Sequence, residues 1–77
     1  MIKYQINHSG KVKIILYDIT GKEIKILVNE IKKEGYYNYQ LNMSNFSSGI
    51  YLYKIETDNY TDIKKIVLVK INDTYII

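Results

Sequence analysis

Hydrophobic and polar residues alternate with a period of two along most of this chain, which is the spacing of β-strands with one buried face. Residues 2–6 run apolar, polar, apolar, polar, apolar, and residues 11–14 alternate too before an apolar run over 14–17. The side chains expected to face the core from these two segments are Ile2, Tyr4, Ile6, Val12, Ile14 and Leu16.

Turn-forming residues separate these segments. Asp18 and Gly21 occupy the first and fourth positions of a predicted type I turn over residues 18–21, which would close a hairpin. Residues 23–34 allow two interpretations. Their apolar residues fall at helical spacing before Gly35, a possible helix C-cap, whereas their β-branched residues favour a strand over 23–28 followed by a loop. We expect the strand and keep the short helix as the alternative.

The second half of the chain gives a clearer strand pattern. Strands are expected over residues 36–41, 50–57 and 62–70, with a polar linker over 42–49 and a turn over 58–61. Within the linker, Phe46 is expected to plug one end of the core. The other side chains expected to face inward are Tyr37, Tyr39, Leu41, Tyr51, Tyr53 and Ile55.

Short strands at intervals of eight to twelve residues, without a sustained helical pattern, predict an all-β antiparallel sandwich of six to seven strands. The 77 residues are enough for one domain. Cysteine is absent, so no disulfide can stabilise the fold and the core must do so. The chain has the material for a core, since 47% of its residues are apolar and nine are tyrosine.

The net charge of +3 does not indicate a nucleic-acid partner. All the cationic residues are lysines, scattered along the chain, and there is no arginine to form bidentate contacts with phosphate or bases. The longest apolar run, residues 14–17, is too short to insert into a membrane. The first residues lack the apolar stretch of a signal peptide, so an exported form is expected to receive its signal from another segment of a longer protein.

Residues suited to catalysis or metal binding do not form a recognisable set. The single histidine, His8, lies in a predicted turn beside Ser9, without a third group to orient it. Asp58 and Asp62 flank a turn, but their spacing lacks the alternating ligands of a calcium loop. We therefore expect no enzymatic activity, no cofactor and no metal.

Four segments in order resemble the C-terminal sorting domain of type IX secretion substrates. The same segments are similar to the Ig-like domain of flagellar hook-capping proteins. These segments are Gly10-Lys11-Val12, Leu16-Tyr17-Asp18-Ile19-Thr20-Gly21-Lys22-Glu23-Ile24, Ser48-Gly49-Ile50-Tyr51-Leu52-Tyr53-Lys54 and Lys64-Lys65-Ile66-Val67-Leu68-Val69-Lys70.

The resemblance implies an Ig-like sandwich over residues 1–70 that acts as an address label at the end of a larger exported bacterial protein. An outer-membrane secretion machinery would recognise it, and a sortase-like enzyme would process it at the cell surface. The alternative is an accessory Ig-like interaction domain of a surface or flagellar-hook-type protein. Residues 71–77 form an additional tail, which would mask the end of the domain or add a strand.

The last predicted strand is apolar on both faces, although a sandwich strand needs only one apolar face. The tail, a missing strand or a partner would cover the second face, and the strand edge could also pair with another copy. The residues predicted to contact a partner are Lys64, Lys65, Ile66, Val67, Leu68, Val69 and Lys70.

Tyr51 follows a glycine at the entry to a late strand, where the tyrosine corner of Ig-like folds is found. Its hydroxyl group is expected to bond to the upstream backbone, and a docking contact is the alternative. The residues assigned to the structural motif of the family are Asp18, Gly21, Ser48, Gly49, Tyr51 and Tyr53.

Overall fold

The computed structural model describes residues 2–71 and 74–76, and every regular element in them is a β-strand. The strands are β1 (Ile2–Ile6), β2 (Gly10–Asp18), β3 (Glu23–Lys32), β4 (Gly35–Tyr39), β5 (Gly49–Thr57), β6 (Thr61–Ile71) and β7 (Thr74–Ile76).

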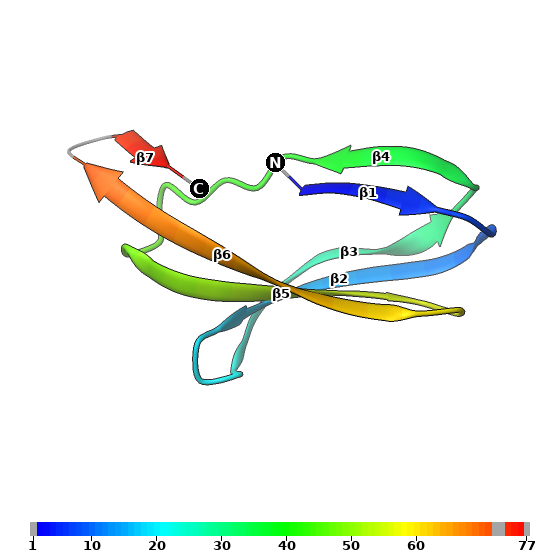
Figure 1. The fold of residues 1–77 in the computed structure, drawn as a ribbon, viewed down its shortest axis with the longest axis horizontal. Helices are drawn as coiled ribbons and strands as arrows, with labels where there is room; N and C mark the ends of the chain where they lie inside the picture. Colours follow the sequence, from blue (N-terminus) through cyan, green and yellow to red (C-terminus); the bar gives the residue numbers. More distant parts are fainter. Residues whose placement is uncertain (1, 72–73, 77) are drawn as a thin grey trace.

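The strands form two antiparallel sheets that pack face to face (Figure 1). One sheet contains β1 and β4, and the other has the strand order β3-β2-β5-β6-β7. Figure 1 shows the small sheet lying over the strongly twisted large sheet. The predicted all-β sandwich is therefore confirmed.

The core lies between the two sheets and consists mainly of aliphatic side chains. The alternating residues of β1 and β2 face inward as the sequence pattern predicts, and half-buried tyrosines and Phe46 pack around them. The five largest fully buried side chains are Val12, Ile14, Leu16, Met43 and Leu68.

The structure corrects the prediction for residues 23–34. The strand β3 continues to Lys32, four residues beyond the predicted end, and the helical alternative is wrong. The register between β2 and β3 shifts between Ile14 and Ile15 and again between Leu16 and Tyr17. Each β-bulge adds a residue to one strand, and the one at Leu27 places Leu27 and Val28 on the same face, so β3 does not keep a period of two.

The segment between β4 and β5 also differs from its prediction. β4 ends at Tyr39, so Leu41 is buried without belonging to a strand. The chain then crosses from the small sheet to the large one, and Met43 lies fully buried on the way. Phe46 is half-buried against the core, as expected.

The predicted turn after β2 is present. The N–H of Gly21 donates to the Asp18 carbonyl at 3.0 Å, and Gly21 has a φ of 90°, which glycine adopts without strain. The Asp18 carboxylate accepts hydrogen bonds from the Thr20 hydroxyl group at 2.5 Å and from the N–H groups of Thr20 and Lys22. These bonds, led by that from the Thr20 hydroxyl, hold the pKa of Asp18 below its usual value.

Candidate partner-binding surface

The two faces of β6 have different surroundings. Ile66 and Leu68 point into the core and are 5% and 1% exposed, respectively. Val67 and Val69 point the other way and are each 46% exposed. Of the five apolar side chains of β6 whose burial the structure describes, two lie in the core and three lie at the surface: Ile63, Val67 and Val69.

The exposed residues of β6 join a larger apolar area on the outer face of the large sheet. In the antiparallel ladder, Val67 lies opposite Ile50 and Lys65 lies opposite Leu52, and opposed residues share a face. Contiguous exposed apolar areas commonly mark interaction sites. We call this area the outer patch; its residues are Ile50, Leu52, Ile63, Lys65, Val67 and Val69.

The C-terminal end of β6 is tied to the crossing segment before β5. The Nζ of Lys70 donates to the Ser44 carbonyl at 2.7 Å, and the N–H of Lys70 donates to the Ser48 hydroxyl at 2.9 Å. At the other end, the Nζ of Lys64 lies 3.9 Å from an Asp62 carboxylate oxygen. Lys70 thus has an internal role in holding the strand in place.

The structure therefore separates the seven residues predicted for partner contact. Ile66 and Leu68 belong to the core, and Lys70 tethers the strand. Lys64 lies opposite Tyr53 in the ladder, with its amino group near Asp62. The side chains that the outer face presents to solvent are those of Lys65, Val67 and Val69.

The strand β7 extends the large sheet beside the end of β6. Thr74–Ile76 pair antiparallel with residues 69–71. This pairing lies along the edge of the sheet, not over its face. Among the described strands, the stretch of β6 from Thr61 to Leu68 has a ladder partner only in β5.

Tyr51 forms the hydrogen bond expected of a tyrosine corner. Its hydroxyl group donates to the Ser47 carbonyl, four residues upstream, at 2.6 Å, and its ring stacks on Phe46 with 5.6 Å between centroids. Tyr37 makes the same kind of bond to the Lys33 carbonyl at 2.6 Å. These hydroxyl groups stabilise chain reversals at the ends of two strands.

Tyr53 and Gly49 also have structural surroundings. Tyr53 is half-buried against the core, and this burial, together with the carboxylate of Asp62, raises the pKa of its hydroxyl group. Gly49 begins β5 and lies opposite Leu68 in the ladder.

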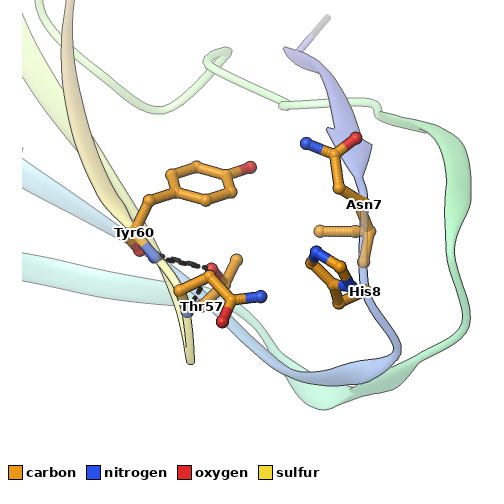
Figure 2. Close-up of a pocket in the computed structure, with 6 residues that line it drawn as sticks. Asn7, His8, Thr57 and Tyr60 are labelled. Carbon is orange, nitrogen blue, oxygen red and sulfur yellow. Dashed lines mark hydrogen bonds between the residues drawn. The ribbon is translucent and has the colours of Figure 1, made fainter.

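A hollow of about 170 Å³ lies where the turn after β1 faces the turn after β5 (Figure 2). Its lining includes His8, Asn7 and Tyr60, and the Thr57 hydroxyl accepts hydrogen bonds from the N–H groups of Asn59 and Tyr60. Thr57 therefore stabilises the turn. In the part of the chain that the structure describes, no three acidic, histidine or cysteine side chains gather as metal ligands would.

Tyr60 is a contact residue that the sequence analysis missed. Its hydroxyl group donates to the Gln5 carbonyl at 3.0 Å and so links the large sheet to the small one. The sequence placed Tyr60 in a turn, and nothing local indicates a partner 55 positions away. The buried Met43 had a detectable signal, because Leu41 and Met43 are spaced by two, as in an extended segment with one buried face.

The structure defines the class of the protein as an all-β sandwich of two sheets with an apolar patch on its outer face. A match to a family model identifies which one: residues 1–70 match the secretion system C-terminal sorting domain. The chain belongs to this family of type IX secretion sorting domains, whose members are sorting signals recognised by the secretion machinery. No curated protein and no solved structure matches the chain. No helix in residues 2–71 or 74–76 is long and apolar enough to cross a membrane.

Proposed function

We propose that this chain directs a larger cargo protein through the type IX secretion machinery to the surface of a bacterium, and that the outer patch contacts that machinery. The match of residues 1–70 to the sorting-domain family supports the first part. It also favours a sorting signal over an accessory interaction domain. In this proposal the chain has no catalytic role, a sortase-like enzyme acts on it, residues 1–70 form the sorting domain, and residues 71–77 are a tail that extends it.

The observation that supports the contact surface is the exposure of Val67 and Val69 on a strand whose opposite face places Ile66 and Leu68 in the core. The exposed part of these side chains adds no burial energy to the isolated domain, since only apolar surface removed from water stabilises it in this way. A partner that covers the outer patch would gain that free energy on binding. Lys65 beside them favours a partner with acidic groups at the rim of its apolar surface.

A reporter fusion tests the sorting role. Residues 1–77 are placed at the C-terminus of a periplasmic reporter and expressed in a host that has the type IX machinery and in a matched host that lacks it. Surface display only in the first host is the expected result. Equal display in both hosts would contradict sorting by this machinery.

A pair of substitutions tests the surface separately. Deleting residues 64–70 would remove core residues, so loss of display would not distinguish recognition from unfolding. Val67→Thr with Val69→Thr keeps the shape of the side chains and leaves the core intact, and it should lower display severalfold. Ile19→Thr, at a residue that is 61% exposed in the turn after β2, is the matched control and should display normally. Normal display of the folded double variant would overturn the role of the outer patch.

A further inference from the structure

The outer edge of β3 carries a symmetric pattern of side chains. β3 is the first strand of the large sheet, and only β2 pairs with it among the described strands. Three of its isoleucines are exposed, with Ile31 at 81%. A strand edge of this kind can pair with another strand.

The register against β2 shows which residues of β3 share a face. Lys25 and Glu30 lie opposite the core residues Leu16 and Val12 and so point to the inner side of the sheet. Val28 also faces the core, opposite Ile14, and Leu27 packs against it. The residues on the outer side lie opposite β2 residues that face away from the core: they are Ile26, Asn29 and Ile31.

The β-bulge at Leu27 gives the middle of β3 the same order of inner and outer residues when the strand is followed in either direction. Leu27 and Val28, at its centre, both contact the core side, and the faces then alternate outward as far as Lys25 on one side and Ile31 on the other. The second register shift follows at Ile24 and ends the symmetric stretch. A second copy of β3 placed antiparallel would therefore match inner residues with inner ones and outer residues with outer ones. The opposed residues would be Leu27 with Val28, Ile26 with Asn29 and Lys25 with Glu30.

The charges fit this arrangement. Glu30 already pairs with Lys32 of its own strand at 2.5 Å. In the two-fold dimer, Lys25 of each copy would lie opposite Glu30 of the other, so each Glu30 gains a second cation. The exposed Ile31 would lie at the end of this paired stretch and be partly covered by the second copy. The stretch of β6 that pairs only with β5 offers no such match. If two copies paired antiparallel there, Lys64 of one copy would lie opposite Lys65 of the other, and these like charges repel.

We infer that the chain forms a symmetric dimer in which two β3 edges pair antiparallel around Leu27 and Val28, joining the two large sheets into one continuous sheet. This association uses the edge of the large sheet at β3, whereas the outer patch lies on the face of the sheet at β5 and β6. It is thus independent of the proposed sorting role.

Sedimentation velocity of the 77-residue chain over a range of concentrations measures this association. The unsubstituted chain should convert from monomer to dimer as concentration rises. Lys25→Glu and Glu30→Lys should each weaken the dimer by about tenfold or more, because two attractive pairs become repulsive. A monomer at all concentrations would overturn the inference, since the bulges and charges of β3 would then only protect a free edge.

Mixing the two single variants gives the sharper result. Lys25→Glu presents two acidic groups and Glu30→Lys presents two basic ones, so each should be monomeric alone while their mixture forms a heterodimer. Failure of the mixture to associate, with both variants folded by far-UV circular dichroism, contradicts the proposed register.

Two further variants keep the test independent of folding. Ile31→Thr changes a solvent-exposed side chain and should weaken the dimer without affecting the fold. Lys3→Glu makes the same charge change as Lys25→Glu on β1 and should leave association unchanged. Equal weakening by Lys3→Glu would indicate a general charge effect and overturn the specific pairing.

Discussion

Tyr51 stabilises the fold through both its ring and its hydroxyl group. The ring packs on Phe46, and the hydroxyl donates to the Ser47 carbonyl. We expect Tyr51→Phe to lower the free energy of unfolding by about 1 kcal/mol, because it removes the hydrogen bond and keeps the ring. Urea denaturation measures this change. Tyr36→Phe is the matched control and should have no effect, since Tyr36 is 83% exposed. Equal stability of the two variants would mean that the corner bond contributes nothing.

Asp18 gives the turn after β2 a dependence on pH. Its pKa in the folded chain is lowered from 3.8, mainly by the hydrogen bond from the Thr20 hydroxyl and then by that from the Lys22 N–H. The stabilisation is therefore complete above the usual pKa and is lost as pH falls below it through the lowered value. The difference in urea midpoint between the unsubstituted chain and Asp18→Asn should shrink as pH falls below about 4. A difference that stays constant from pH 6 to pH 2 would contradict this.

At the scale of the element, neighbouring residues of β6 should respond very differently to substitution. Leu68→Ala removes a fully buried side chain and should cost about 2–5 kcal/mol. A domain of this length has a free energy of unfolding of only about 4–12 kcal/mol, so this variant should be near the limit of folding. Val67→Thr should cost less than about 0.5 kcal/mol, since this side chain is half exposed. Thermal denaturation of the two variants checks the contrast, and similar midpoints would mean that the faces of β6 are wrongly assigned.

The strands β3 and β6 of the large sheet have similar compositions but present different surfaces, because they pair differently with their neighbours. β6 pairs with β5 without a register shift, whereas β3 pairs with β2 through two shifts. A regular strand keeps its apolar residues on fixed faces and so presents the outer patch. In a bulged strand, the side chains that point to the core switch from odd to even positions at the bulge. This switch creates the symmetric edge on which the dimer inference rests.

At the scale of the whole molecule, the two sheets should differ in local stability. The small sheet has only two strands, and a two-stranded sheet is marginal without packing against another element. Core contacts and the bond from Tyr60 to the Gln5 carbonyl hold it to the large sheet. Amide hydrogen exchange should therefore be faster in β1 and β4 than in β2 and β5.

Tyr60→Phe should widen this difference, because the variant loses the hydrogen bond between the sheets and keeps the aromatic ring. Exchange in β1 should accelerate severalfold, while exchange in β2 should change little. Equal protection of all four strands, before and after the substitution, would show that the sheets open only together.

The sequence alone determined the strands from the alternation within them and the turn residues between them, because a period of two reports one buried face and turn residues mark strand ends. It therefore placed β1, β2 and β5 closely, and the order of its segments pointed to the family that the family model then identified. It also located β6 and its two apolar faces, although the set 64–70 mixed core residues with exposed ones.

Tertiary structure decided the features that depend on residues far apart in the chain. The length of β3 depends on bulges against β2, the burial of Met43 depends on how the crossing segment passes between the sheets, and the bond from Tyr60 to Gln5 depends on sheet packing. Local alternation contains no information about which strand lies beside or across from another. The exposed area of Val67 and Val69, and the symmetric edge of β3, became visible only when those neighbours were in place.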